Sequence, residues 1–270
     1  MRTIPLLPAL AGLILAAAST GHATGAAPTD STGIRQLESQ AYATGDGHLM
    51  YTESHWLYAD HGVPARLVLY RCPDGRPFAR KWLREDGPAQ APDFELTDGR
   101  TGYREGVRRT GDGRIVFVQS GGGATERTAK LPDSPDLVID AGFDAYIRQH
   151  WDRLGRGDAE TVPFLIPSRL GTLNFKVRRL DDALVEGRPA RRYRLGLASW
   201  IGFALPHIDV AYDAANRELL QFVGLANIRG SNGDNVRARI VFDPVAAHPA
   251  TPGALDAARA EPLDGRCPIP

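Results

Sequence analysis

Histidines and carboxylates are the residues of this sequence most suited to metal binding or acid–base catalysis. His48, His55 and His61 lie within one short span, but their spacings of seven and six residues fit no usual metal-ligand pattern. Asp60 and His61 are an adjacent acid and imidazole, yet neighbours on a strand point to opposite faces and so form a poor catalytic pair. The sequence therefore predicts neither a metal site nor a cofactor.

Motifs that identify an enzyme are missing from the chain. It has no Gly-x-Ser-x-Gly elbow, no phosphate-binding loop and no His-Glu-x-x-His. Residues 120–123 (Ser-Gly-Gly-Gly) resemble a nucleophile loop only superficially, because no helix follows them. The turn at residues 230–235 has too few aspartates for a calcium loop. We therefore assign no catalytic residue, and the sequence favours a protein without enzymatic activity.

The N-terminus has the order of a secretory signal peptide. Arg2 is the only charged residue before Asp30, and an apolar stretch runs from Ile4 to Ala18. That stretch is shorter than the ~20 residues that a membrane-spanning helix needs, and small residues follow it. We expect cleavage after Ala23, with Ala26 as the alternative position. The mature chain should have no membrane span and lie in the periplasm or be secreted. An uncleaved membrane anchor is the alternative.

Net charge and chain length limit the classes of binding partner and the number of domains that we expect. The whole chain has 32 basic and 32 acidic residues, so no net field attracts nucleic acid or an anionic membrane surface. About 245 residues remain after cleavage, enough for one large β domain or two small ones. We expect a signal peptide at 1–23, a flexible linker at 24–35, a single β-rich domain at 36–246 and an Ala/Pro-rich tail at 247–270.

Two cysteines, Cys72 and Cys267, make up the whole thiol content. Neither belongs to a Cys-x-x-Cys pair or to a known nucleophile setting. An even count in an exported chain favours a disulfide over two free thiols. The bond would close a loop of about 195 residues and stabilise the fold by roughly a few kcal/mol, because it would hold a loose C-terminal tail.

The hydrophobic pattern predicts a fold dominated by antiparallel strands. Alternation resumes at Leu173–Val177 and continues from Ile208 to Phe242, where we expect a three-stranded meander. Between Asp140 and Gly155, apolar residues recur at three- and four-residue steps, which predicts one amphipathic helix capped by those two residues. The predicted class is α+β, mainly antiparallel β: a curved sheet or half-barrel with one amphipathic helix packed across it. Candidate strands in the first half span 49–58, 65–71, 78–84, 103–109 and 115–119, with a hairpin turn at 110–113.

An uncharged run from Leu195 to Leu205 interrupts the alternating strands. One interpretation is a strand end covered on both faces by the helix; another is a loop that carries apolar side chains into a cavity. Contact with a membrane is a third. The second interpretation predicts a binding site for an apolar ligand. Its candidate residues are Trp151, Phe164, Ile166, Trp200, Ile201 and Phe203.

Two segments carry a resemblance to a known family. The first, 143–180, contains the predicted helix, Gly155, the stretch Pro163–Pro167 and the strand at Phe175. The second segment, 208–242, contains Tyr212-Asp213, Arg217, Leu220 and residues 224–228 before its last strand. The layout is similar to the periplasmic lipoprotein carriers of the LolA/LolB type and to uncharacterised exported proteins of gram-negative bacteria. This resemblance implies a half-barrel whose concave apolar face receives acyl chains without covalent chemistry.

These observations favour a non-enzymatic periplasmic protein that binds a lipid or another apolar molecule in a half-barrel cavity. A hydrolase of envelope components, with a site assembled from distant residues, is one alternative. An assembly factor that meets envelope proteins through a sheet edge is the other. A pocket that holds a histidine and a carboxylate within hydrogen-bond reach would favour the hydrolase.

Overall fold

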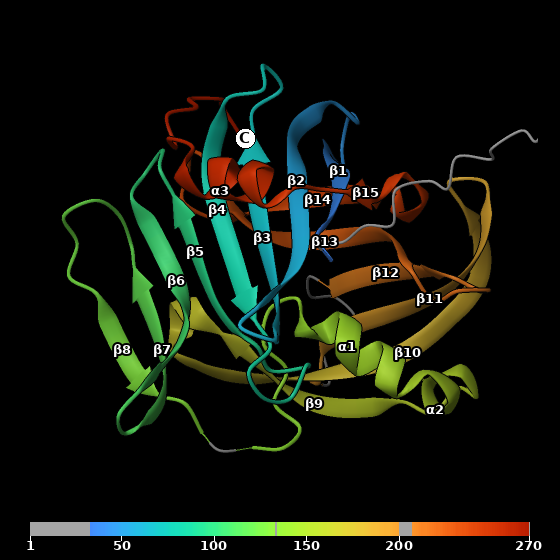
Figure 1. Ribbon diagram of the computed structural model, residues 1–270. Coiled ribbons are helices and arrows are strands. Elements are labelled where there is room, and N and C mark those ends of the chain that lie inside the picture. Colours follow the sequence, from blue (N-terminus) through green and yellow to red (C-terminus); the bar gives the residue numbers. More distant parts are fainter. Residues whose placement is uncertain (1–32, 133, 200–206, 270) are drawn as a thin grey trace, which may run out of the picture. The chain divides into compact units, whose positions relative to one another are not determined.

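The strands of the chain join in one sheet. The structure is a computed structural model that describes residues 33–132, 134–199 and 207–269. Within these ranges fifteen strands form a curved, mostly antiparallel sheet that does not close on itself (Figure 1). This confirms the predicted fold class. The strands are β1 (Arg35–Ala43), β2 (Leu49–Asp60), β3 (Val63–Arg71), β4 (Pro77–Arg84), β5 (Asp93–Asp98), β6 (Tyr103–Thr110), β7 (Gly113–Gln119), β8 (Arg127–Lys130), β9 (Glu160–Ile166), β10 (Gly171–Val185), β11 (Arg188–Leu197), β12 (His207–Asp213), β13 (Leu219–Arg229), β14 (Asn235–Phe242) and β15 (His248–Pro249).

Two meanders meet at the first strand of the domain. The order is β8 to β1 in reverse sequence, then β14 down to β9, so β1 lies between β2 and β14. The predicted hairpin at 110–113 joins β6 to β7, and the predicted meander from Ile208 to Phe242 is β12–β13–β14. Strands β1, β5, β8, β9 and β15 were not among the predicted ranges. Strand β1 has few large apolar residues, whereas β5 does alternate, with Phe94 and Leu96 buried between half-buried polar neighbours.

Strand β9 lies at one end of the sheet, and its outer edge is covered. The chain between β8 and the first helix runs along β9 and forms a parallel bridge from Val138 to Phe164. The amide of Val138 donates to Pro163, and the amide of Leu165 donates back to Val138, both at 2.9 Å. Pairing of this kind protects an edge strand from association with other chains.

The predicted helix between Asp140 and Gly155 is instead two helices, α1 (Gly142–Gln149) and α2 (Trp151–Gly155), separated at His150. Asp140 does not cap α1; the N-cap is Ala141, which makes no side-chain cap bond. The backbone of Asp140 has a φ of 48°, and its carboxylate bonds to residues of the sheet. Gly142 is required at the start of α1, because a Cβ there would lie 2.1 Å from the carbonyl oxygen of Gln90. Tertiary contacts therefore decide where the helix begins.

A third helix, α3 (Pro252–Ala260), packs on the outer face of the sheet (Figure 1). Its Leu255 and Ala258 contact a small cluster that includes Trp56 of β2 and Leu67 of β3. Thr251 caps the helix by accepting a hydrogen bond from the amide of Ala254 at 3.2 Å. Since the other faces of β2 and β3 belong to the main core, both strands are buried on two sides.

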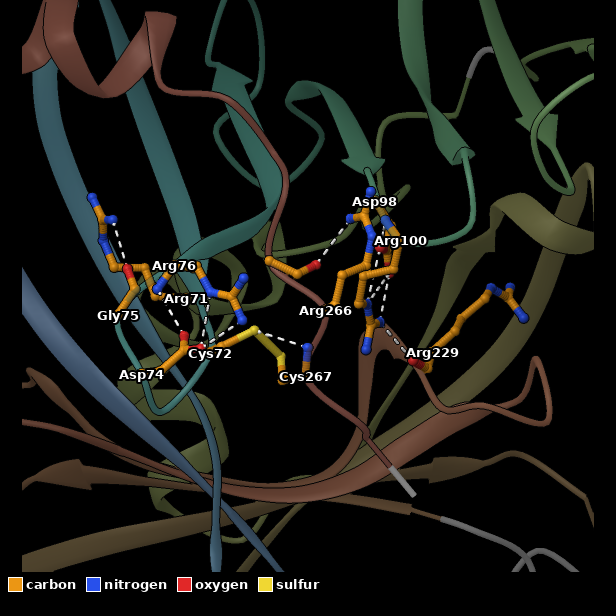
Figure 2. The surroundings of a disulfide bond; sticks show 11 residues. Arg71, Cys72, Asp74, Gly75, Arg76, Asp98, Arg100, Arg229, Arg266 and Cys267 are labelled. Atoms are coloured by element: carbon orange, nitrogen blue, oxygen red, sulfur yellow. Dashed lines mark hydrogen bonds and ion pairs between the residues drawn. A yellow bond between two sulfur atoms is a disulfide. The ribbon is translucent and has the colours of Figure 1, made fainter.

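The C-terminal segment is fastened to two strand turns. Cys72 and Cys267 form the predicted disulfide, which Figure 2 shows beside the turn between β3 and β4. Arg71 makes two hydrogen bonds to the carboxylate of Glu261, at 2.8 and 2.7 Å. At the other turn, between β13 and β14, the amide of Ser231 donates to Ile269 at 3.0 Å. The segment thus connects turns from both meanders.

Candidate functional site

A cavity of about 300 Å³ lies between the two meanders. Strands β2, β3, β4 and β6 supply mainly polar and charged side chains on one side. Strands β9, β10, β13 and β14 supply mainly apolar ones on the other. We call the first set, Glu53, His55, Arg66, Tyr70, Lys81 and Glu105, the polar wall, and the second set, Phe164, Phe175, Leu219, Phe222, Ile240 and Phe242, the apolar wall.

Strand register places the charged groups of the polar wall on the inner face. His55 is opposite Val68, which is opposite Lys81. The same cross-strand row continues from Lys81 through Leu96 to Glu105. Directly opposed residues of antiparallel strands share a face, so alternate strands of this row present an ionisable side chain to the cavity.

Ser39, Glu53 and His55 form a buried cluster on β1 and β2. Ser39 Oγ donates to Glu53 Oε2 at 2.9 Å, and His55 Nε2 lies 3.0 Å from the same oxygen. Ser39 Oγ is also 3.2 Å from His55 Nε2. A nucleophilic triad uses different histidine nitrogens for the hydroxyl and the carboxylate, whereas one nitrogen serves both here. Ser39 is also not among the described residues that line the cavity. The cluster is therefore not arranged as a triad.

The electrostatics of the cluster favour an ionised Glu53 and a neutral His55. Burial alone would raise the pKa of Glu53, but the hydrogen bond from His55, the charge of Lys81 and the hydrogen bond from Ser39 lower that pKa below its ordinary value. Burial lowers the pKa of His55 and outweighs the bond to Glu53, which acts in the opposite direction. A neutral imidazole that donates through Nε2 leaves Nδ1 as an acceptor.

Asp140 connects the polar wall to the strand opposite. Its Oδ2 accepts from Lys81 Nζ of β4 at 2.9 Å, and its Oδ1 accepts from Asn227 Nδ2 of β13 at 2.5 Å. The side chains of Lys81 and Asp140 are 10% and 2% exposed. Such a pair is costly to break, since either partner alone would be a buried, uncompensated charge.

Glu105 is the third carboxylate at this cavity. It accepts a hydrogen bond from the Tyr103 hydroxyl at 2.6 Å, and Arg229 donates to the same hydroxyl at 2.8 Å. Burial raises the pKa of Glu105 above its ordinary value, more than the bond from Tyr103 and the charge of Arg229 lower it. Ionisation of Glu105 therefore destabilises the folded protein, whereas ionisation of Glu53 stabilises it.

Aromatic contacts organise the apolar wall. The rings of Phe164 and Phe175, on neighbouring strands, have centroids 5.3 Å apart. Phe222 lies 6.1 Å from Phe143 of α1. Phe242 lies 5.9 Å from the His55 ring and brings the two walls together at β1. These spacings are within the range in which aromatic pairs attract one another.

The structure separates the residues predicted to bind a ligand. Phe164 and Ile166 line the cavity. Trp151 does not: α2 places it in the core, where its ring contacts Tyr193 and Tyr212 with the Arg191 guanidinium 4.5 Å away. The remaining three, Trp200, Ile201 and Phe203, lie outside the described residues.

Sequence reasoning missed most of the polar wall, and β4 shows why. As whole residues, Lys81 is 8% exposed and its neighbour Trp82 is 49% exposed, the reverse of what the polarity of their side chains indicates. The only sequence signal is the two-residue rhythm that places Ala79, Lys81 and Leu83 on one face.

The described residues contain neither a metal-binding cluster nor a membrane-spanning helix. No group of three or more His, Cys, Asp or Glu side chains in those ranges is placed to hold a metal ion. No helix in the described part is long and apolar enough to cross a membrane. The disulfide fits an extracytoplasmic location.

Comparisons with known proteins give only distant likenesses. The chain matches no protein-family model, and no curated protein matches its sequence. A β-barrel-like protein of domain of unknown function DUF1849 from Brucella abortus superposes with a TM-score of 0.48 at 6% identity, over 78% of this chain and 96% of that one. A domain named for outer membrane lipoprotein sorting, from Vibrio parahaemolyticus, gives 0.29 at 8% identity, over 84% and 89%. A DUF1329 family protein from Desulfovibrio piger gives 0.29 at 8% identity, over 80% and 85%.

One of these structures is named for outer membrane lipoprotein sorting, the class of protein that the sequence resembles. All of these TM-scores are below 0.5, so neither the site nor the function proposed below depends on them.

Proposed function

We propose that this protein binds a lipid or another apolar molecule in the cavity between its two walls, without covalent chemistry, in the periplasm or outside the cell. The observation that carries the proposal is the apolar wall, where six large side chains, four of them phenylalanines, face one cavity. Binding sites for small molecules are concave and mostly apolar, with a few placed polar groups. The cavity has this composition.

The size of the cavity limits the ligand. Its volume of about 300 Å³ is at the lower end of the roughly 300–1,000 Å³ typical of ligand pockets. A ligand with a single alkyl chain fits this volume better than a lipid with several chains. Binding removes apolar surface of both the ligand and the cavity from water. This burial drives binding by about 25 cal/mol per Å² of apolar surface.

The test is a binding measurement with a matched pair of variants on β10. The protein is purified without detergent, examined by native mass spectrometry for bound lipid, and then titrated with 1-dodecanol in competition with a fluorescent apolar probe. Phe175→Glu places a charge in the apolar wall, whereas Leu184→Glu alters a side chain that is 73% exposed on the same strand. We expect Phe175→Glu to lose at least about ten-fold in affinity, since a buried charge is costly, and Leu184→Glu to bind as the parent does.

Two results would overturn this proposal. One is the absence of both co-purified lipid and dodecanol binding in the parent protein. The other is unchanged binding by a folded Phe175→Glu variant, with folding checked by thermal unfolding.

A hydrolytic activity is the second candidate, because one observation favours it. The cavity contains a histidine and a carboxylate within hydrogen-bond reach, His55 and Glu53. A neutral His55 held by Glu53 could take a proton from water. The test is a screen of ester, glycosidic and peptide substrates with the parent protein and His55→Gln. Turnover that His55→Gln abolishes would support the hydrolase, and no turnover by the parent would reject it.

A further inference from the structure

Arg66 differs from the other cations of the cavity. It is half-buried on β3 and lines the cavity. Lys81 is paired with Asp140, and Arg229 donates to the Tyr103 hydroxyl and to the carbonyl of Gly233. Among the described residues, no carboxylate forms an ion pair with Arg66, and no acceptor forms a hydrogen bond with its guanidinium. Its guanidinium therefore offers free donors to whatever occupies the cavity.

The nearby carboxylates already have donors of their own. Glu53 accepts from Ser39 and His55, and Asp140 accepts from Lys81 and Asn227. Glu105 accepts from Tyr103. The charge of Arg66 nevertheless reaches the interior of the cavity, since it lowers the pKa of His55 and counteracts the rise in the pKa of Tyr70.

The register places Arg66 where a ligand could meet both polar and apolar surface. It is opposite Leu57 of β2 and Leu83 of β4. Val68, the next inward residue of β3, lies between His55 and Lys81 in the cross-strand row. A ligand whose charged end reaches Arg66 could therefore extend an apolar chain toward the apolar wall.

We propose that Arg66 selects an anionic amphiphile, an alkyl chain with an acidic oxyanion at one end, by binding that oxyanion while the chain occupies the apolar wall. This inference rests on the proposed function and specifies its ligand class. A guanidinium can bind a carboxylate or a phosphate through two parallel N–H bonds. Both head groups share this chemistry, and the experiment separates them.

The experiment compares three probes with equal chains: dodecanoate, dodecyl phosphate and 1-dodecanol, below their micelle concentrations at pH 7.5. We expect at least one of the two acids to bind about ten-fold or more tightly than the alcohol, because a charge-assisted bond is stronger than a neutral one. The acid with the larger preference identifies the head group. The affinity for that acid should fall as NaCl is raised, whereas the affinity for the alcohol should not.

The variants assign the preference to one residue. Arg66→Gln should bind the acid no more tightly than the alcohol and leave binding of the alcohol unchanged, and Arg66→Lys should keep part of the preference. The control is Arg237→Gln, an exposed arginine of β14 outside the cavity lining, which should bind as the parent does. Thermal unfolding verifies that each variant folds.

Four outcomes are decisive. Equal binding of the acids and the alcohol by the parent protein, or an unchanged acid preference in Arg66→Gln, overturns the role of Arg66 but leaves the proposed function in place. Failure of all three probes to bind the parent, together with the absence of co-purified lipid, overturns the proposed function itself. If Arg66→Gln does not fold, the salt dependence of the parent still decides, because a salt-independent acid affinity contradicts an ionic contact.

Discussion

The two walls of the cavity differ in how they accommodate buried side chains. On the polar wall, buried charges have bonded partners: Glu53 has Ser39 and His55, and Lys81 has Asp140. On the apolar wall, rings such as Phe164 and Phe175 contact one another and leave apolar surface facing the cavity. The polar wall requires exact positions of its bonded partners, because an unpaired buried charge is costly. The apolar wall tolerates ligands of varied shape, since apolar contact is non-directional.

This difference implies separate roles. Substitutions on the polar wall should change mainly the stability of the fold and its dependence on pH. Substitutions on the apolar wall should change mainly ligand affinity. Arg66 is the exception, as the member of the polar wall that we assign to ligand binding. Each of the following predictions tests this division.

The largest effect should come from Asp140→Ala. The variant leaves Lys81 as a buried charge without its partner, so we expect the free energy of unfolding to fall by about 3–5 kcal/mol. Denaturant unfolding measures it. Asp140→Asn keeps a residue type that tolerates the φ of 48° and separates loss of charge from backbone strain. A loss below about 1 kcal/mol in both variants would contradict the role of this pair.

Substitutions in the apolar wall should lower the affinity of the protein for an apolar ligand. The double variant Phe164→Ala, Phe175→Ala removes the ring pair, and we expect dodecanol affinity to fall by about ten- to a hundred-fold, as the loss of roughly 1.5–3 kcal/mol of apolar contact implies. Isothermal titration calorimetry measures it. His61→Gln, at a side chain that is 91% exposed, serves as the control. Unchanged affinity in the folded double variant would exclude this wall as the binding surface.

The stability of the parent protein should decrease in acid because of His55 and Glu53. Both pKa values are lowered in the folded state, so the unfolded chain binds more protons than the folded protein does. The free energy of unfolding therefore decreases as the pH is lowered. The decline should begin near 6.5, the ordinary value for His55, and continue below 4.5, that for Glu53. Between about pH 7.5 and pH 5 the profile of His55→Gln should be flatter, while His61→Gln should follow the parent. Parallel profiles for His55→Gln and the parent would refute the assignment.

The smallest effect should come from Glu105→Gln, and its sign is opposite to that of a change at Glu53. The pKa of Glu105 is raised, so its contribution to stability is present below about 4.5 and is lost as pH rises through the folded pKa. Glutamine can still accept from the Tyr103 hydroxyl, so we expect a change within about 1 kcal/mol at pH 7, in favour of the variant at higher pH. Glu53→Gln should be destabilising at the same pH. Thermal unfolding at pH 6 and pH 8 compares the two, and equal losses would show that the two carboxylates do not differ.

Local pattern was sufficient for much of the sheet. The turn chemistry at 110–113 predicted the β6–β7 hairpin, and two-residue alternation predicted the meander from Ile208 to Phe242. Both features form between residues that are close in sequence. A short segment of the chain is therefore enough to predict each of them. The helix between Asp140 and Gly155 was predicted in its apolar stripe but not in its caps. Asp140 bonds to Lys81 and Asn227 instead of capping α1, and Gly155 is the last residue of α2, whose C-cap is Arg156.

The sequence by itself determined the antiparallel β class and the cysteine pair. It also named Phe164 and Ile166, which line the cavity, and their binding of a ligand stays a prediction. Only the tertiary structure decided the polar wall. Alternation shows which residues share a face, but it does not show which face meets the core, and on β2 and β3 both faces are buried. The pairing of Lys81 with Asp140, 59 residues apart, and the lack of a bonded partner for Arg66 among the described residues follow from how the sheet curves and which strands meet.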